Sequence, residues 1–210
     1  MLEPYIERIL TQLPGWNAAE AKVSPLEGGI TNQNYRVDAG GGIFVLRIGG
    51  KGTHLLGIDR SRESVCTAIA AQVGVGAEVV CFLEAEDVLV TRFIVGSLLT
   101  AEAVVQDAML QRIVSSMKRY HAGPAFPGSF SPFVTVRNYY RLALEHGVDF
   151  PDTLARVFAL MAQIEAALTP NQQIRPCHND LLASNFIDDG QVIRILDWEY
   201  AGMGDRKSVV

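Results

Sequence analysis

The sequence predicts an α+β fold with a strand-rich first half and a helical second half. Short alternating apolar segments, separated by Gly-rich turns, occupy most of residues 22–94, with one helical segment among them. Beyond residue 100, apolar residues recur instead at helical spacing. We therefore expect two lobes, residues 1–95 and 96–210, with the boundary near Gly96.

The expected elements of the first lobe are bounded by turn and capping residues. A short amphipathic helix covers residues 4–13. Strands are expected over 22–26, 33–38, 43–48, 78–83 and 88–94. The helix between the third and fourth of these strands covers 60–73, with Asp59 or Ser61 as its N-cap. Gly74 is expected to end it, because glycine readily adopts the left-handed conformation found after helices.

Two helices and a hairpin are expected in the second lobe. A helix over 101–121 begins after the N-cap Thr100 and carries one apolar face. That face consists of Val105, Met109, Ile113 and Met117. An irregular stretch over 123–132 follows, and then a helix over 152–168.

The tail of the chain predicts a β-hairpin. Residues 185–187 form one strand, and 191–196 form the other, joined by a two-residue turn at Asp189-Gly190. This turn would pair Asn185 with Arg194.

Composition narrows the class of protein. The formal net charge of −5 over 210 residues argues against a nucleic-acid partner, which requires a basic face. No apolar run is long enough to span a bilayer. The three cysteines, Cys66, Cys81 and Cys177, contain no CxxC pair, so we expect neither a disulfide framework nor a zinc site, and a cytoplasmic location.

The residues best suited to chemistry lie around the expected hairpin. His178, Asp180 and Asn185 have the spacing H-x-D-x-x-x-x-N, and Asp197 follows the returning strand. Phosphoryl transfer needs a carboxylate to accept the proton of the attacking hydroxyl and oxygen ligands for Mg²⁺. Asp180 is the candidate base, and Asn185 and Asp197 are candidate metal ligands. The alternative is that these are ordinary polar loop residues beside a hairpin.

The segments H-N-D-L-L-A-S-N and I-L-D-W-E-Y-A-G resemble the signature of the choline/ethanolamine kinases and their bacterial relatives. These kinases belong with the aminoglycoside phosphotransferases. The resemblance runs from about residue 22 to residue 206, and it implies a protein-kinase-like two-lobe fold with an antiparallel sheet in the N-lobe. It also implies transfer of the γ-phosphoryl group of ATP, with Mg²⁺, to a hydroxyl of a small cationic metabolite, most simply choline or ethanolamine. His178 would be a buried support of the catalytic loop formed with Asp180.

The resemblance also implies a nucleotide site in the first lobe. Gly28 and Gly29, with Thr31 and Asn32 near the tip, resemble the loop that covers the phosphates.

Arg47 and Glu63 resemble the ion pair between the third strand and the following helix of kinases. A charged residue inside an apolar strand needs a partner, and Glu63 lies on the same helix face as Cys66 and Ala70. The alternative is an edge-strand arginine that extends to solvent.

Two further predictions rest mainly on the resemblance. The segment V-L-V-T-R-F-I, which includes Arg92 and Phe93, resembles the interlobe hinge that binds adenine; a plain buried strand is the alternative. Trp198 and Glu199 would hold the cationic acceptor by cation–π and charge attraction; the alternative for Trp198 is packing in the core.

Members of the family continue beyond the position of Arg206 with helices that complete the C-lobe. We therefore expect an incomplete C-lobe with exposed apolar surface on the 101–121 helix. A non-catalytic nucleotide-binding remnant is the alternative to an active kinase. A kinase for thiamine or an aminoglycoside is also compatible with the motifs.

Overall fold

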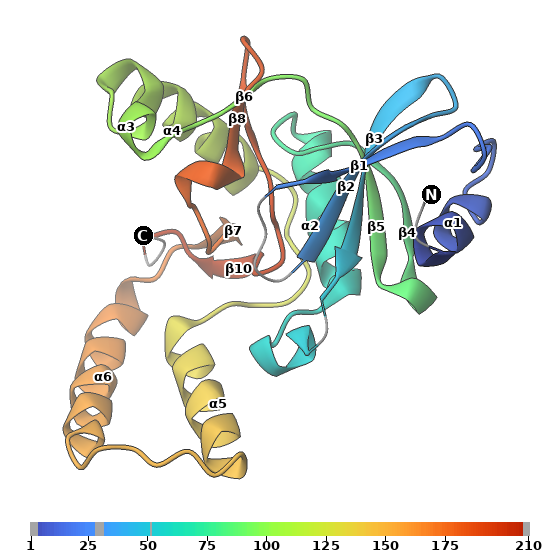
Figure 1. Cartoon of the computed structure of the whole chain (residues 1–210). Coiled ribbons are helices and arrows are strands. Elements are labelled where there is room, and N and C mark those ends of the chain that lie inside the picture. The colour runs from blue at the N-terminus through green and yellow to red at the C-terminus, as the bar shows by residue number, and fades with distance from the viewer. Residues whose placement is uncertain (1–3, 28–31, 51, 208–210) are drawn as a thin grey trace.

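The computed structural model describes residues 4–27, 32–50 and 52–207. Its first half is a five-stranded antiparallel sheet with the strand order β1-β2-β3-β5-β4 (Figure 1). The strands are β1 Lys22–Leu26, β2 Asn32–Ala39, β3 Gly42–Gly49, β4 Val79–Leu83 and β5 Val88–Arg92. All five strands lie within about two residues of the predicted segments.

The two faces of this sheet are different because side chains alternate along a strand. Helix α1 (Pro4–Thr11) buries Ile9 and Leu10 in one apolar cluster with Leu46 of β3. On β3, the neighbouring Arg47 points to the opposite face, where it meets helix α2 (Arg60–Gln72). The sheet therefore has an apolar cluster on one face and the ion pairs of Arg47 on the other.

The predicted boundaries of α2 are confirmed. The Asp59 carboxylate is the N-cap and accepts a hydrogen bond from the Arg62 amide at 2.9 Å. Gly74, at φ +78°, lies in the left-handed region just beyond the helix. Among the predicted face residues, Glu63, Cys66 and Ala70 are all buried.

After β5 the chain leaves the five-stranded sheet and enters the second half. There β6 (Ser97–Leu98) pairs with β8 (Phe186–Asp188), which pairs with β9 (Ile193–Ile195). A separate two-stranded sheet joins β7 (Ile174–Cys177) to β10 (Gly202–Asp205). Short 3-10 turns cover Thr53–Leu56, Glu84–Glu86, Thr169–Asn171 and Ala183–Asn185.

The helix predicted over 101–121 is two helices, α3 (Ala101–Val104) and α4 (Asp107–His121). Thr100 caps α3 as predicted, by accepting a hydrogen bond from the Ala103 amide. Ile113 is buried, and Met109 and Met117 pack against the core. The expectation of an exposed apolar face there is therefore wrong for three of its four residues, and only Val105, at the break between the helices, is well exposed.

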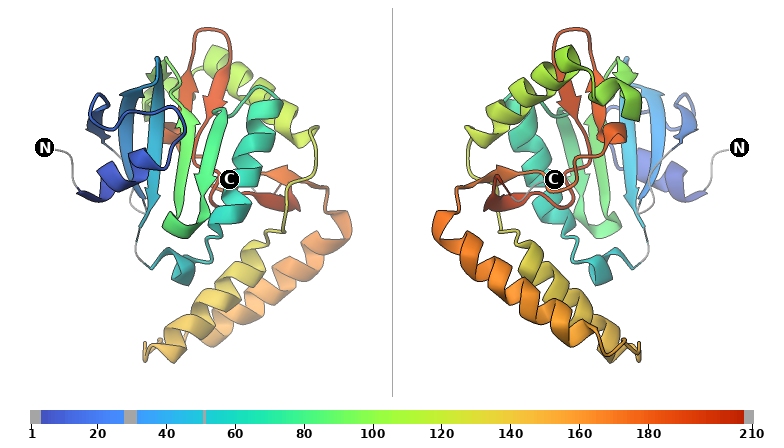
Figure 2. Two further views of the ribbon diagram at one scale, coloured as in Figure 1. Left: turned by 90° about the vertical axis from the view of Figure 1, so that its right-hand side faces the viewer. Right: turned by 90° about the vertical axis from the view of Figure 1, so that its left-hand side faces the viewer.

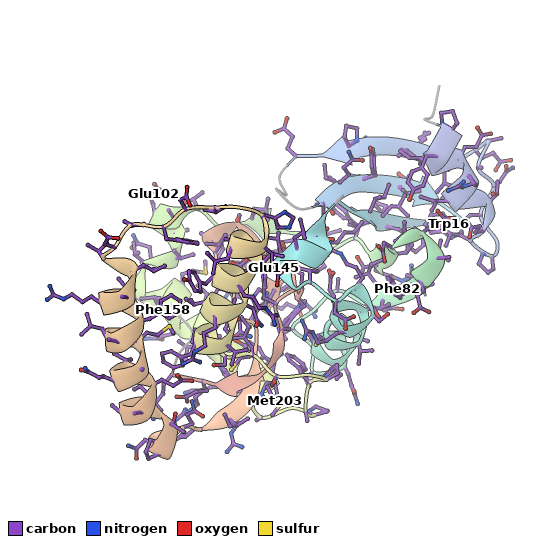
Figure 3. All side chains as sticks on the ribbon, turned by 90° about the horizontal axis from the view of Figure 1, so that it is seen from below. Trp16, Phe82, Glu102, Glu145, Phe158 and Met203 are labelled. Carbon is purple, nitrogen blue, oxygen red and sulfur yellow. The ribbon has the colours of Figure 1, made fainter. Side chains whose placement is uncertain are left out.

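Much of the exposed apolar surface lies on a helical hairpin. Helix α5 (Pro132–Glu145), which the sequence analysis did not identify, is capped by Ser131 and runs beside α6 (Leu154–Leu168). Figure 2 shows the pair projecting from the rest of the molecule, and within both helices no residue is buried. Tyr140 and Phe158 meet between the helices with ring centroids 4.9 Å apart, and Figure 3 shows Phe158 far from Trp16 at the other end of the molecule.

The hairpin at the end of the chain forms in a different register from the predicted one. Ile187, rather than Asn185, pairs with Arg194, so the connecting loop spans residues 189–192. The Asp189 carboxylate accepts hydrogen bonds from the amides of Gln191 and Val192, which stabilises this longer loop. Asn185 therefore lies opposite Leu196, whose amide donates to its carbonyl at 2.8 Å. Asp197 is thus only one residue beyond that pair.

In the part of the chain that the structure describes, no helix has both the length and the apolar character needed to cross a bilayer. The three cysteines are all free thiols.

Candidate active site

His178 lies at the base of the predicted catalytic loop and is fully buried. Its Nε2 atom is 2.7 Å from the Leu196 carbonyl, and its Nδ1 atom accepts the Asp180 amide at 3.2 Å. Burial lowers the pKa of this imidazole to about 4, so the ring is neutral near pH 7, with one nitrogen donating and the other accepting. His178 therefore joins the loop to the strand before Asp197, and both of its ring nitrogens are engaged within the protein.

Asp180 and Asn185 are brought together by the turn that follows His178. The Asn185 side-chain Nδ2 atom donates to the Asp180 carbonyl at 2.9 Å, which leaves the amide oxygen as the atom suited to a cation. Partial burial raises the pKa of the Asp180 carboxyl, and the nearby charges of Asp197 and Glu199 raise it further. A raised pKa makes this carboxylate a better proton acceptor.

Asp197 occupies the turn that leaves β9, with φ +67°. A non-glycine residue in this region is uncommon and is tolerated best by Asn and Asp. Its carboxylate oxygen Oδ1 lies 2.5 Å from Nη2 of Arg47, and the side chain keeps 25% of its surface exposed. Arg47 therefore holds the Asp197 carboxylate on the side that faces the sheet, and another side of the carboxylate is open to solvent.

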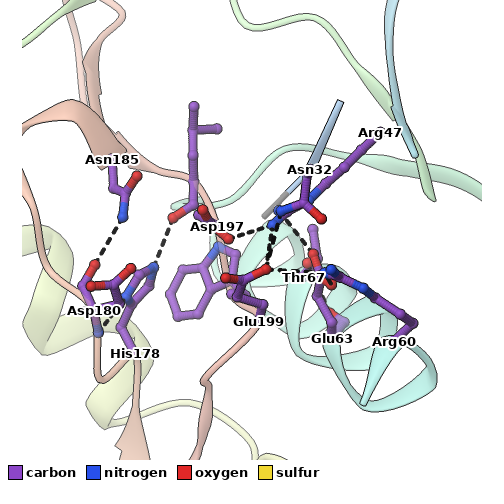
Figure 4. A network of polar contacts seen from close by, with 12 residues as sticks. Asn32, Arg47, Arg60, Glu63, Thr67, His178, Asp180, Asn185, Asp197 and Glu199 are labelled. Atoms are coloured by element: carbon purple, nitrogen blue, oxygen red, sulfur yellow. Dashed lines mark hydrogen bonds and ion pairs between the residues drawn. The ribbon is translucent and has the colours of Figure 1, made fainter. Parts of the chain in front are cut away.

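Arg47 is at the centre of an ion-pair network that joins the sheet, α2 and the segment after β9 (Figure 4). Its Nη1 atom is 2.8 Å from the Glu63 carboxylate, which is the predicted ion pair. Its Nη2 atom contacts both Asp197 and Glu199, the latter at 3.0 Å. Burial alone would lower the pKa of this guanidinium, but these three carboxylates outweigh it and raise the pKa. The alternative of a solvent-directed Arg47 is excluded.

The predictions that Trp198 and Glu199 bind the acceptor are wrong. Trp198 is 1% exposed and packs edge-on against Tyr120 and His178, while its indole nitrogen donates to the Ile195 carbonyl at 3.0 Å. Glu199 is 3% exposed and accepts from two arginines. Side chains buried in this way present no surface to a substrate.

The structure describes only part of the predicted nucleotide-binding segment. Gly28, Gly29 and Thr31 lie outside the described residues. Asn32 begins β2 and is buried, and its Nδ2 atom donates to the Glu199 carboxylate at 3.1 Å. It is therefore an anchor of the strand that leaves the Gly-rich segment, rather than a residue at a loop tip.

Arg92 and Phe93, in the predicted adenine-binding hinge, have their backbone N–H groups engaged within the first lobe. The Arg92 amide donates to the Glu78 carbonyl at 2.8 Å, and the Phe93 amide donates to the Ile43 carbonyl at 3.0 Å. Both N–H groups are thus used within the protein, and binding of adenine by this segment stays a prediction. The Arg92 side chain is exposed, lies over the Phe44 ring and pairs with Glu78.

Comparison with known proteins decides the family. The sequence model of choline/ethanolamine kinases matches residues 23–207, which is most of the chain. The chain belongs to the choline/ethanolamine kinase family. The protein LicA of Haemophilus influenzae is 32% identical over 182 residues, which cover 85% of this chain and 53% of that protein.

Solved structures of this family share the fold. A choline/ethanolamine kinase family protein from Mesorhizobium loti is 29% identical, with a TM-score of 0.77 over 96% of this chain and 66% of its own. The choline kinase LicA from Streptococcus pneumoniae, 24% identical, has a TM-score of 0.78 over 97% of this chain and 70% of its own. An aminoglycoside phosphotransferase has the same fold, at 18% identity and a TM-score of 0.66 over 97% of this chain and 73% of its own. The chain spans about half to two thirds of the length of its first relatives.

Sequence reasoning missed two residues of the candidate site, Arg60 and Asn179. Arg60 joins Glu63 at 2.6 Å and Glu199 at 3.0 Å, both through Nη1. The available signal was its position three residues before Glu63, which places the two on one helix face. Asn179, at φ +69°, donates through its side chain to the Tyr200 carbonyl at 2.9 Å and gave no comparable signal.

The side chains present fit Mg²⁺ only together with a nucleotide. Among the described residues, no group of three or more His, Cys, Asp or Glu side chains is arranged to hold a metal. Asp197 and Asn185 offer one carboxylate and one amide oxygen, and Mg²⁺ commonly binds one or two such groups together with substrate phosphates and water. The donor set therefore suits a metal that arrives with ATP.

Proposed function

We propose that this chain transfers the γ-phosphoryl group of ATP to a hydroxyl of a small cationic metabolite, with choline or ethanolamine as the acceptor. The observation that carries the proposal is the arrangement around His178, in which one connected set of hydrogen bonds joins Asn185, Asp180 and Leu196, the residue before Asp197. Phosphoryl transfer depends mainly on positioning and electrostatics, so a fixed base beside two oxygen donors is what it requires.

The proposed roles follow from the chemistry of each group. Asp180 accepts the proton of the acceptor hydroxyl as that oxygen attacks phosphorus, and its raised pKa favours this. Asp197 and the Asn185 amide oxygen would hold Mg²⁺, which neutralises charge on the phosphates when it is bound. Arg47 keeps Asp197 in place from the sheet side.

The nature of the acceptor rests on the relatives. Solved structures with this fold include a choline kinase and an ethanolamine kinase, and LicA has been solved in complex with AMP. Because Trp198 and Glu199 are buried, no described residue identifies the cation. The three free thiols are in keeping with activity in the reducing cytoplasm.

The test is a panel of acceptors scored by ADP release and by detection of the phosphorylated product. We expect turnover with choline or ethanolamine and little with thiamine or an aminoglycoside. Asp180→Asn should lower kcat by about 10²–10⁴-fold while nucleotide binding changes little. Asp38→Asn makes the same chemical change on exposed β2 surface and should have no effect.

Two results would contradict the proposal. Nucleotide binding without transfer to any acceptor would favour the remnant that lacks catalysis. Normal turnover by Asp180→Asn would remove Asp180 from the role of base.

A further inference from the structure

The network around Arg47 contains a second buried arginine to which the proposed reaction gives no role. Arg60 is the first residue of α2, and its side chain is 9% exposed. Through one nitrogen, Nη1, it contacts the Glu63 oxygen Oε2 at 2.6 Å and the Glu199 oxygen Oε2 at 3.0 Å. Figure 4 shows it on the far side of Glu63 from Asp180 and Asn185. Its ion pairs are thus with Glu63 and Glu199 and not with the groups proposed to touch the substrates.

The charges of this network need both arginines. Three carboxylates face one another here: Glu63, Asp197 and Glu199. Glu63 gives one oxygen to each arginine, Oε1 to Arg47 and Oε2 to Arg60. Without Arg60, Glu63 and Glu199, which are both almost fully buried, would each lose an arginine that contacts them. Buried charges that lose a partner are strongly destabilising, so the arrangement would change.

A change in this ion-pair network would affect the reaction site through Glu199. One of its oxygens, Oε2, accepts from Arg47, Arg60 and Asn32, all within 3.1 Å. Glu199 therefore connects β3, α2 and the first residue of β2. It is also two residues after Asp197 on the same segment, so the position of Glu199 constrains that of Asp197.

We propose that Arg60 is a positioning residue of the phosphotransfer site, which acts by holding Glu199. In this role it fixes Asp197 relative to the start of β2, where the chain leaves the Gly-rich segment. The proposal rests on the proposed function for its catalytic consequence. Its structural consequence is that residues 32–38 and 196–200 become less ordered when Arg60 is replaced. This consequence does not depend on catalysis.

The experiment compares Arg60→Met, which keeps the apolar stem, with Arg60→Lys, which keeps a charge. Because both contacts come from one nitrogen, a lysine ammonium can in principle make both. The matched control is Arg112→Met, which removes another bridging arginine, the partner of Asp188 between α4 and β8. The first measurement is hydrogen–deuterium exchange, read at residues 32–38 and 196–200.

In Arg60→Met we expect amide exchange at both segments to rise about tenfold or more, and in Arg60→Lys we expect most of the protection to return. The control should leave both segments unchanged. In the transfer assay, Arg60→Met should lower kcat about 100-fold with little change in the KM of the acceptor, because misplacement rather than lost contact is the cause.

The outcomes separate the two proposals. If the unaltered chain transfers no phosphoryl group, the proposed function fails, and the exchange data still decide on Arg60. Unchanged exchange at both segments in Arg60→Met overturns the positioning role, as does an equal rise in Arg112→Met. A lysine variant as impaired as the methionine variant overturns the claim that the charge of Arg60 is what matters. If Arg60→Met does not fold, Arg60→Gln replaces it and is judged by the same exchange measurement.

Discussion

Trp198 provides a direct test of whether the segment after Asp197 is core or acceptor site. We predict that Trp198→Phe destabilises the fold and leaves acceptor binding unchanged. The substitution removes the indole N–H from the Ile195 carbonyl, at a cost of about 1–2 kcal/mol. The smaller ring also leaves space beside Tyr120 and His178, which costs about 1–2 kcal/mol more.

The sum, about 2–4 kcal/mol, corresponds to a fall in Tm of roughly 5–15 °C for a chain of this size. The assay is thermal and urea-induced unfolding of the unaltered chain and the variant, followed by tryptophan fluorescence. The chain has two tryptophans, so each single variant retains one reporter. The KM of choline or ethanolamine is measured in parallel.

The matched control is Trp16→Phe, since Trp16 is only half-buried, against Phe44 of the central strand β3. Its Tm should fall by less than half as much. If Trp198→Phe unfolds like the unaltered chain but raises the KM of the acceptor, the side chain contacts substrate and the assignment to the core is refuted.

Three other variants or treatments test the remaining features. Asp197→Asn should weaken nucleotide binding at least about tenfold with Mg²⁺ present, and much less with EDTA, by calorimetric titration; equal losses would remove Asp197 as a metal ligand. Burial raises the pKa of Cys66 to about 12 and of Cys177 to about 11, so at pH 8 both stay protonated, and a thiol reagent should label them at least about tenfold more slowly in the folded chain than in urea. Ile164→Glu, on the exposed apolar surface of α6, should reduce self-association in sedimentation velocity runs without lowering Tm; an unchanged association state would show that this surface is not used.

Local signals in the sequence were sufficient for the first half of the fold. Asp59 and Gly74 bound α2 because capping and left-handed geometry depend on residues within one turn of the helix end. The pair formed by Arg47 and Glu63 was predictable because a charge in an apolar strand requires a partner nearby in space.

The errors in the second half arose at turns, where the periodic patterns of strands and helices give no guidance. Asp189 stabilises a four-residue loop through its own side chain, and this moved the hairpin register by two residues. Trp198 follows Asp197 directly, yet the one side chain enters the core and the other is partly open, because the turn at φ +67° directs them differently. The position of a residue next to a site residue in the sequence does not predict whether its side chain faces the core or the solvent.

Helix α5 was missed although its sequence carries a helical pattern. Val136, Tyr139, Tyr140 and Ala143, at the spacing i, i+3, i+4, i+7, line a groove together with residues of α6, and none of them is buried. The Ser131-Pro132 pair, an N-cap followed by proline at the first helical position, was the signal that could have located its start.

The way the α5–α6 hairpin is attached makes it suitable for exchange between family members. The chain enters it just after Phe130, whose amide donates to the Met203 carbonyl, and returns at Ile174, which pairs with Asp205. Both attachment points therefore lie on β10, and residues 132–173 can be regarded as one cassette with adjacent ends. Chimeric enzymes that take this cassette from a choline kinase or an ethanolamine kinase would keep the Arg47 network and His178 intact. Such chimeras would separate, in one series, what the helical hairpin contributes to acceptor choice from what the catalytic loop contributes.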